Sequence, residues 1–541
     1  MHSDTAAASR IWDAIVIGGG HNGLVAAAYL AKAGRDVLLL ERRPIVGGAC
    51  VTEEIVPGFK FSRAAYVNSL FRPTIIRDLR LKEHGFRMLP RNPSSFTPLL
   101  DGRSLLLGRS AAQNHESIAR FSKRDADAFP EYEQLLTRLA DFVEPLLDQP
   151  PIDPLARGTS WVSTLWPLTK ATWRALRLGR DLYSLLEIMS APARKILDRW
   201  FESEPLRATL ATDAIIGAMV SPSVPGSGYV LFHHVMGETD GNRGVWGYVE
   251  GGMGRLSEAI RSAAEAHGAQ VRTNAEVAEI TVRRGQAAGV VLADGTELRA
   301  RQVLSGADPY TTFIRLLPAE HLPDDFRGRL ASLDVSSGVT KINVAIDRLP
   351  DFTALPGTTP GPQHRGTIHL CQSVEEIEAG YVEALAGQPS SRPIVEMTIP
   401  SSLDTTLAPP GQHVASLFVQ YTPYKLTEGS WDDPGRKDAF ADRVFSVVEE
   451  FAPGFTESII ERDVLSPLDL ERVFNLTGGN IFHGAMSLDQ LYFLRPAPGW
   501  SHYHTPIRGL YLCGSGAHPG GGVLGAPGRN AALIALRAAD A

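Results

Sequence analysis

Asp13-Ala-Ile-Val-Ile-Gly-Gly-Gly-His-Asn-Gly23 places three consecutive glycines directly after a short apolar run. The run Ala14–Ile17 is too short for a helix and suits a buried parallel strand. Leu24–Lys32 favours a helix, which Gly34 ends, and Asp36–Leu40 is a second buried strand. The sequence therefore predicts a strand, a glycine turn, a helix and a second strand, in that order.

The glycines of this stretch have the spacing of a dinucleotide-binding turn. Gly18 permits the tight turn, Gly20 lets the backbone approach a pyrophosphate, and Gly23 lets the helix pack closely on the strand. The amides of the first helical turn, where Asn22 lies, and the helix dipole stabilise phosphate charge. Glu41 closes the second strand, where it can accept hydrogen bonds from ribose hydroxyls. We expect an adenine dinucleotide here.

A second glycine pair distinguishes FAD from NAD. In Glu41-Arg-Arg-Pro-Ile-Val-Gly-Gly48 a bare backbone can face the other side of the pyrophosphate, as a flavin dinucleotide threaded into a protein requires. No second strand–glycine–helix fingerprint for NAD(P) follows. We therefore predict FAD as the cofactor. The residues expected beside it in this segment are Arg42, Gly47, Gly48 and Ala49.

The C-terminal end carries a similar pattern. Gly509-Leu-Tyr-Leu-Cys-Gly514 reads as a strand that ends in glycine, and a helix follows from about Leu524 to Ala539. The N-terminus of such a helix suits the negative charge that develops on the pyrimidine edge of a reduced flavin. We expect both chain ends to meet on one cofactor. The C-terminal residues expected to bind it are Gly514, Ser515, Gly521, Gly522 and Val523.

A third segment lies between these two. Gly251-Gly-Met-Gly254 opens a helical stretch to Ala266. Strand-like runs follow at 269–273, 275–283 and 290–298, with a turn at 294–295, and 302–306 reads as one more strand. We expect residues 11–56, 248–310 and 505–541 to build a discontinuous FAD-binding domain. Residues 57–247 and 311–504 would then form a substrate and cap domain.

These motifs, with several runs outside them, resemble the carotenoid and retinoid oxidoreductase (phytoene desaturase-like) family. The further runs are Val51–Arg63, Trp200–Leu206, Pro225–Val230, Thr340–Asn343 and Gly478–His483. The resemblance implies an α/β fold with a glutathione-reductase-like FAD-binding Rossmann domain and an inserted α+β substrate domain, as in the amine oxidase and phytoene desaturase superfamily. That domain holds an antiparallel sheet and a helical cap. In the family, the backbone at the position of Val277 contacts the adenine.

Composition fits a large globular enzyme. The chain of 541 residues exceeds one core. Its residues are 44% hydrophobic and 21% charged, which is ordinary for a globular protein. A net charge of −7 argues against nucleic acid as a partner. Cys50, Cys371 and Cys513 have no C-x-x-C spacing, which argues against disulphide reduction and for a reducing compartment. We expect the cytoplasm, or the mitochondrial matrix as for eukaryotic relatives, and no metal, since no clustered Cys/His spacing occurs.

The first inserted block is helical and rich in tryptophan. Phe129–Leu147 has an apolar stripe at helical spacing. Within 160–201, four tryptophans alternate with basic residues, as in a helix that lies on a membrane surface. The alternative that we favour is a helical cap whose stripe packs on its own domain. Peripheral membrane contact therefore stays open, as does the oligomeric state.

The second inserted block is richer in strands. Runs at 338–347, 366–371, 394–400 and 413–421 carry β-favouring residues, and we expect them to form an antiparallel sheet over the flavin. Residues 432–451 then read as a helix stopped by Pro453-Gly454.

Lys341 is the first candidate for a catalytic group. It matches the position at which amine oxidases hold a lysine that reaches flavin N5 through water, where a cation could steer oxygen or stabilise reduced flavin. The alternative, a lysine on the solvent face of a strand, has equal weight.

Histidines are the other candidates. His233 and His234 are adjacent on an expected strand, so at most one would serve as a general base, and we name His233. His518 is nearest to the expected flavin loop, although a turn-stabilising role is as well supported. Tyr229, His483 and Tyr492 are weaker candidates.

The sequence thus predicts an FAD-dependent oxidoreductase that moves hydride between a carbon centre of an apolar substrate and flavin N5, with oxygen or a quinone as acceptor. A flavin amine oxidase is the alternative enzyme, but Cys513-Gly-Ser-Gly-Ala-His-Pro-Gly520 follows the desaturase pattern. A non-catalytic FAD protein that binds a partner, as in the related Rab escort and dissociation-inhibitor fold, is the third hypothesis.

Overall fold

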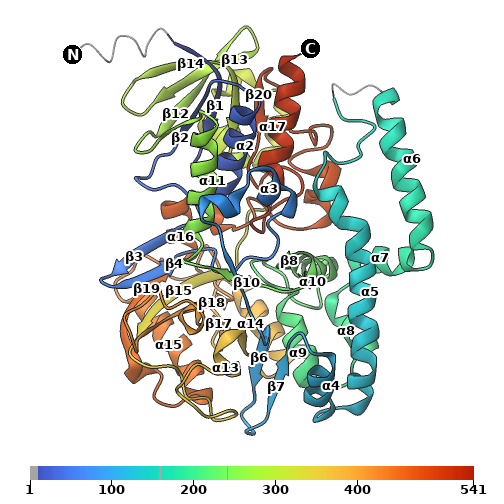
Figure 1. The fold of residues 1–541 in the computed structure, drawn as a ribbon, viewed down its shortest axis with the longest axis vertical. Coiled ribbons are helices and arrows are strands. Elements are labelled where there is room, and N and C mark those ends of the chain that lie inside the picture. The colour runs from blue at the N-terminus through green and yellow to red at the C-terminus, as the bar shows by residue number, and fades with distance from the viewer. Residues whose placement is uncertain (1–9, 158–160, 240–241, 541) are drawn as a thin grey trace.

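The computed structural model describes residues 10–157, 161–239 and 242–540. Two seven-stranded sheets and a group of helices make up the molecule (Figure 1). The first sheet lies in the upper part of that view, the second in the lower left, and the helices of residues 111–235 on the right. The C-terminal helix α17 (Ala526–Ala539) packs against helix α2 (His21–Lys32) and strand β20 (Leu510–Leu512) (Figure 1).

The first sheet joins strands from both ends and the middle of the chain. Its order is β11-β2-β1-β14-β13-β12, and β20 also pairs with β14. The pairs among β11, β2, β1, β14 and β20 are parallel, whereas β12, β13 and β14 pair antiparallel. The bounds are β1 (Ile11–Ile17), β2 (Val37–Leu40), β11 (Gln270–Arg272), β12 (Val277–Arg283), β13 (Gln286–Leu292), β14 (Glu297–Ser305) and β20 (Leu510–Leu512).

Helix α2 (His21–Lys32) lies between β1 and β2, which confirms the predicted strand–turn–helix–strand unit. The helix is buried because α11 (Gly254–Ala266) and α17 (Ala526–Ala539) pack against it. A Cβ on Gly23 would lie 2.1 Å from the carbonyl oxygen of Gly18, so only glycine permits this close approach.

One strand prediction in this sheet needs correction. The expected strand at 302–306 is the second half of β14, which runs without a break from Glu297 to Ser305. Exposed Arg299 alternates with buried Leu298 and Ala300 in its first half, so a half-exposed strand continues directly into a buried one.

The second sheet has the order β19-β15-β18-β17-β16-β6-β7. All its pairs are antiparallel, as predicted, except β16 with β6. Its last two strands come from the first inserted block, which the sequence patterns missed. The bounds are β6 (Ser95–Pro98), β7 (Ser104–Leu107), β15 (Val339–Ile346), β16 (Thr367–Leu370), β17 (Ile394–Thr398), β18 (His413–Gln420) and β19 (Ile459–Leu465).

Helix α15 (Arg436–Phe451) packs its apolar side chains on one face of this sheet. It begins four residues later than predicted, because Gly435 adopts a left-handed conformation (φ 73°) immediately before it, which glycine accepts without strain. The opposite face of the sheet carries Lys341 and Phe418, which line the large cavity described below.

The helical part contains α4 (Ala111–Ala119), α5 (Lys123–Leu147), α6 (Trp161–Leu178), α7 (Asp181–Ser190), α8 (Ala193–Trp200), α9 (Glu204–Thr212) and α10 (Ser227–Val235). The predicted strand around His233 and His234 is wrong, because both lie on α10. This helix is buried along most of its length and shows no amphipathic period, so its aromatic and branched residues resembled a buried strand.

The tryptophan-rich segment also differs from the favoured expectation. Trp166 and Trp173 on α6 are 78% and 65% exposed, so they do not pack on their own domain. Trp200 does pack against the core of the helical part. Figure 1 shows α6 at the margin of the molecule, beside α5. Residue 160, at the start of the predicted segment, lies outside the described residues.

The remaining elements connect these parts. They are α3 (Pro73–Asp78), α12 (Asp324–Ala331), α13 (Pro362–Arg365), α14 (Val374–Leu385), α16 (Pro467–Phe474), and the strand pairs β3 (Thr52–Val56) with β4 (Phe59–Ser62), β5 (Met88–Pro90) with β10 (Gly247–Val249), and β8 (Glu238–Thr239) with β9 (Asn242–Arg243). Within the described ranges, every helix falls short of the length and apolar character needed to cross a bilayer.

Candidate active site

A cavity of about 800 Å³ lies between the two sheets and the helical part. The glycine fingerprint, the C-terminal loop and one face of the second sheet all line it. The predicted cofactor-binding residues that line it are Gly18, Gly20, Asn22, Gly23, Glu41, Arg42, Gly48, Ala49, Val277, Ser515, Gly522 and Val523. The structure therefore brings most of the predicted FAD site to one cavity.

Three predicted cofactor residues lie behind the cavity wall. The amide of Gly47 donates to the carbonyl of Gly19 over 2.8 Å and so braces the fingerprint turn. Added Cβ atoms on Gly514 and Gly521 would lie 2.3 Å from the carbonyl oxygen of Gly306 and 2.6 Å from the Phe482 ring. These glycines permit close packing of the loops that line the cavity.

A direct contact joins the two ends of the chain. The Asn22 side-chain amide donates to the hydroxyl of Ser515 over 3.1 Å, across 493 sequence positions. The carbonyl oxygen of the same Asn22 amide is buried and has no partner among the described residues. Since a buried polar atom is rarely left unpaired, this oxygen points to a ligand group that the protein itself does not supply.

The fingerprint leaves space where a pyrophosphate would lie. A Cβ on Gly20 would meet no protein heavy atom within 4 Å, although Gly20 is only partly exposed, in the turn at the start of α2. No acidic residue occupies the first turn of this helix, so its free amides face an open site of positive character. These features fit the phosphates of FAD.

Two backbone amides hold the Glu41 carboxylate in place. Its Oε2 accepts a hydrogen bond from the Gly19 amide over 2.7 Å, and its Oε1 accepts one from the Arg43 amide over 2.8 Å. Each carboxylate oxygen retains a further lone pair, so the group can also accept from ribose hydroxyls.

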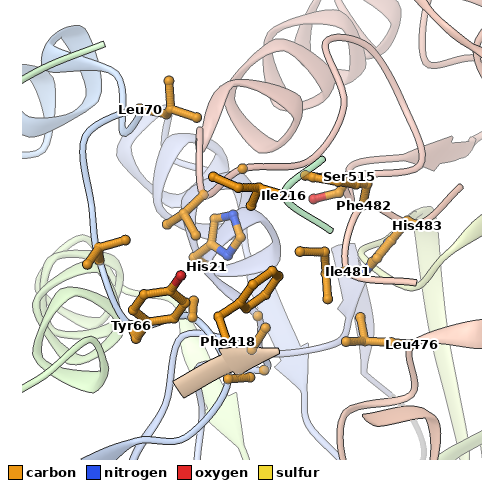
Figure 2. Close-up of a pocket in the computed structure, with 18 of the residues that line it drawn as sticks. His21, Tyr66, Leu70, Ile216, Phe418, Leu476, Ile481, Phe482, His483 and Ser515 are labelled. Atoms are coloured by element: carbon orange, nitrogen blue, oxygen red, sulfur yellow. The ribbon is translucent and has the colours of Figure 1, made fainter. Parts of the chain in front are cut away.

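An apolar region adjoins the fingerprint. Figure 2 shows His21 with Ile216, Phe418, Ile481 and Tyr66 around it. Burial lowers the pKa of His21 to about 3, with a further contribution from His483, so its ring is neutral at pH 7. The sequence did not single out His21, Tyr66 or Phe418; the position of His21 inside the glycine motif was a usable signal, whereas no motif marks the other two.

Lys341 lies inside the cavity wall rather than in solvent. The side chain is 1% exposed, so the solvent-face alternative is wrong. Its Nζ donates to Oδ1 of Asn343 over 2.7 Å and to the hydroxyl of Ser416, and it lies 5.1 Å from the centre of the Tyr66 ring. Burial lowers the pKa of Lys341 to about 7, although Asp463 opposes this shift, because the charged form is disfavoured away from water.

The structure does not place His233 or His518 in the lining of this cavity. His233 packs against Gly522, where an added Cβ would lie 2.8 Å from Nε2. Burial lowers the pKa of His233 to about 3, which makes it a weak base. The Nε2 of His518 donates to the carbonyl of Leu146 over 3.1 Å, a contact that suits the turn-stabilising alternative. His234 and His483 do line the cavity.

Tyr229 and Tyr492 lie outside the large cavity, with their ring centres 6.2 Å apart. Tyr492 and His518 line a smaller pocket of about 170 Å³. Cys50, Cys371 and Cys513 are buried and free, so the structure shows no redox pair among them. No group of three or more metal-ligating side chains occurs in the part of the chain that the structure describes.

Arg495 is a structural residue that the sequence patterns missed. It is 3% exposed, and its guanidinium donates to the carbonyls of Phe482 and Ser515 over 2.6 and 2.9 Å. It also reaches the carbonyls of Ala485 and Gln490. It therefore ties the loop after residue 481 to the C-terminal flavin loop.

We expect Arg495→Met to lower the free energy of unfolding by about 3 kcal/mol, because several buried carbonyls would lose their donor. Urea unfolding followed by circular dichroism measures this. The control is Arg348→Met: Arg348 is half-exposed, and its loss should cost less than about 1 kcal/mol. Equal effects of the two substitutions would contradict the role given to Arg495.

Two protein-family models match this chain. The family model of the NAD(P)-binding Rossmann-like domain matches residues 16–78, and that of flavin containing amine oxidoreductase matches residues 176–532. A rat protein named pyridine nucleotide-disulfide oxidoreductase domain-containing protein 2 is 55% identical, over 97% of this chain and 93% of the relative.

A phytoene desaturase (lycopene-forming) of Pseudescherichia vulneris is 27% identical, over 97% of this chain and 99% of the relative. The crystal structure of an oxidoreductase from Methanosarcina mazei has a TM-score of 0.58 at 20% identity, and covers 97% of this chain and 99% of that one. This structural likeness confirms the fold predicted from the sequence.

Proposed function

Because the chain belongs to the family of flavin containing amine oxidoreductases, we propose that it is an FAD-dependent oxidoreductase that moves hydride between a carbon centre of an apolar substrate and the flavin. The observation that carries this proposal is the single cavity that the glycine fingerprint, the C-terminal loop and an apolar wall share. The likeness to a phytoene desaturase along nearly the whole chain supports an apolar substrate.

Different residues of the chain would bind different parts of FAD. The first turn of α2 would hold the pyrophosphate, Glu41 the ribose, and the backbone at Val277 the adenine. Bound FAD would supply the hydride acceptor, and oxygen or a quinone would take the electrons from the reduced flavin. Lys341 would hold a positive charge in a site from which the surrounding side chains exclude water, where such a charge acts strongly.

Anaerobic photoreduction of the purified protein, followed by admission of air or a quinone, tests this function. We expect the flavin to be reduced and then reoxidised within the time of an enzyme assay. A flavin that neither reduces nor reoxidises would favour the non-catalytic, partner-binding hypothesis.

The amine oxidase alternative has its own test. If the protein oxidises common amines, peroxide should be released when they are added to the holoprotein in air. We expect no peroxide from such amines, and we expect bleaching of the flavin when the true substrate is added without oxygen. Turnover of a simple amine would replace the first proposal by the second.

We also propose that α6 and α7 contact an anionic membrane surface. Exposed apolar side chains gather on these helices: Leu165, Trp166, Trp173, Leu176, Tyr183 and Leu186. Lys170, Arg174 and Arg177 lie on the same helix α6 and would meet the lipid headgroups. Such contact would let an apolar substrate enter from the bilayer.

Co-sedimentation with anionic phospholipid vesicles tests this contact. We expect the protein to bind at low salt, and Trp166→Ala with Trp173→Ala to weaken binding at least tenfold. Val382→Ala with Leu385→Ala is the matched control, because both residues are 63% exposed on α14. Absence of binding at low salt, or equal loss in the control, would contradict the proposal.

The cellular compartment of the protein is a further part of the proposed function. Three buried, free cysteines support a reducing environment, and we propose the cytoplasm, or the mitochondrial matrix in a eukaryotic cell. Burial raises the pKa of Cys50 to about 12, so this thiol is not a reactive one.

A further inference from the structure

A row of four side chains, three of them polar, crosses the cavity-facing side of the second sheet. Lys341 pairs with Phe418 in register, Phe418 with Glu396, and Glu396 with His369. Directly paired residues share one face of a sheet, and all four line the large cavity. Since neighbouring strands lie ~4.8 Å apart, Lys341 and His369 are separated by about 14 Å. The row therefore has two polar ends with an aromatic middle.

The Glu396 end of this row offers hydrogen-bond acceptors to the cavity. Glu396 is 5% exposed, and its Oε1 lies 3.3 Å from Nδ1 of His369. Its Oε2 has no hydrogen-bond partner among the described residues. A carboxylate buried to this degree that lines a cavity is suited to accept a hydrogen bond from a ligand.

His369 is fixed in one orientation. The hydroxyl of Thr212 donates to the carbonyl of Thr209 over 2.8 Å. The same hydroxyl therefore accepts from Nδ1 of His369 at 3.0 Å, because its one proton is already used. Nδ1 thus carries the proton of the ring. In the neutral ring, Nε2 is then an acceptor, and it too has no partner among the described residues.

Asp213 adds a third acceptor. It follows α9 directly and lines the same cavity, and none of the described residues gives its carboxylate a hydrogen bond. Burial and the neighbouring Glu396 raise the pKa of Asp213 to about 7, against the opposing effects of His369 and Arg91, as expected of a carboxylate away from water and beside a like charge. Arg91, Asp213, His369 and Glu396 all line the same cavity.

Arg91 is the guanidinium of this cluster, and two of its nitrogens donate to the protein. Arg91 donates to the hydroxyl of Thr367 over 2.8 Å and to the carbonyl of Trp246 over 3.4 Å, and it lies 5.4 Å from the centre of the Tyr248 ring. When the His369 ring is neutral, two carboxylates face one guanidinium, and the cluster then favours a hydrogen-bond donor over an anion.

We propose that Asp213, His369 and Glu396 form a subsite for a hydrogen-bond-donating head group, an ammonium or a hydroxyl, of an otherwise apolar substrate. The inference rests on the proposed function, because the reacting carbon would lie towards Lys341, at the other end of the row. Phe418, and Tyr66 with its ring centre 5.8 Å from that of Phe418, would contact the apolar body between the two ends (Figure 2).

Isothermal titration calorimetry on the holoprotein tests the subsite with four probes of equal chain length: decylamine, decanol, decanoate and decane. We expect decylamine and decanol each to bind at least tenfold more tightly than decanoate or decane. The stronger of the two identifies the head group as ammonium or hydroxyl. Equal affinities, a preference for decanoate, or no binding of decylamine and decanol would overturn the inference.

A double variant assigns the preference to these residues. Asp213→Asn with Glu396→Gln should bind the preferred probe at least tenfold more weakly than the wild type. The control is Glu461→Gln, an exposed carboxylate on the edge strand β19 of the same sheet, which should leave binding unchanged. Unchanged binding in the double variant would overturn the inference, and if that variant does not fold, the wild-type series alone decides.

The outcome is separable from that of the proposed function. If the holoprotein is photoreduced and reoxidised but shows no preference for a donor head group, the subsite is contradicted and the oxidoreductase function is not. If the flavin is inert but the holoprotein prefers decylamine or decanol, the subsite is supported and the oxidoreductase function is contradicted.

Discussion

Replacing Gly20 by alanine should lower the affinity for FAD at least a hundredfold and leave the apoprotein as stable as the wild type. The added methyl group would meet no protein atom within 4 Å. The backbone of Gly20 is extended, a conformation open to any residue, so the fold tolerates the change. The same methyl group would occupy the place where the backbone must approach the pyrophosphate. Equilibrium dialysis against FAD and urea unfolding of the apoprotein measure the two quantities.

The matched control for this substitution is Gly328→Ala on α12. A Cβ at Gly328 also meets nothing within 4 Å, but this residue does not line the cavity. The control should keep the wild-type affinity for FAD. Full FAD occupancy in Gly20→Ala would show that the pyrophosphate does not lie at this turn, whereas a drop of more than about 1 kcal/mol in apoprotein stability would show that the turn is tightly packed.

Lys341→Met should slow turnover at least a hundredfold while FAD remains bound. The substitution keeps the length of the side chain but removes the buried charge that Asn343 and Ser416 orient towards the site, where a fixed charge acts on the reacting groups. The rates of flavin reduction and reoxidation, measured by stopped flow, identify the slowed step. Lys60→Met, at an exposed position on β4, is the control and should not change either rate.

The pH dependence gives this prediction a second readout. The pKa of Lys341 is about 7 in the folded protein, so the charged form is lost as the pH rises through 7, and activity that needs the charge falls there. This step should be absent in Lys341→Met. A step near pH 7 of unchanged size in the variant would assign it to another group.

The effect of Lys341 on stability has the opposite sign to its effect on activity. The unfolded chain holds the proton up to the ordinary pKa of 10.5, so between pH 7 and 10.5 it binds more protons than the folded protein. Wild-type stability therefore rises with pH in this interval. Lys341→Met should be more stable than the wild type at pH 7 and below, and this difference should shrink as the pH approaches 10.5.

The FAD-binding elements were predictable because their signals are local. A buried parallel strand, a glycine turn and a helix follow one another within residues 11–40, and the C-terminal strand and helix repeat this short-range pattern, which periodicity and glycine spacing reveal. The sequence also made Lys341 a candidate catalytic residue, but it did not determine whether the side chain was buried.

Features that depend on register and on contacts between distant elements were not predictable. His369, Glu396 and Lys341 come from strands whose spatial order differs from their order in the chain, so no sequence spacing brings them together. Arg495 donates hydrogen bonds to backbone carbonyl groups. Every residue carries such a group, so no sequence motif indicates these contacts. Helix α10 is buried along most of its length, and the sequence of such a helix has no alternation of polar and apolar residues that would distinguish it from a buried strand.

The absorption spectrum of the purified protein, with quantification of the cofactor released on denaturation, tests the central claim most directly. We predict a yellow protein with flavin bands in the blue that releases one FAD per chain. A colourless protein that takes up no FAD on reconstitution would contradict the account, because the cavity between the fingerprint and the C-terminal loop would then serve another ligand.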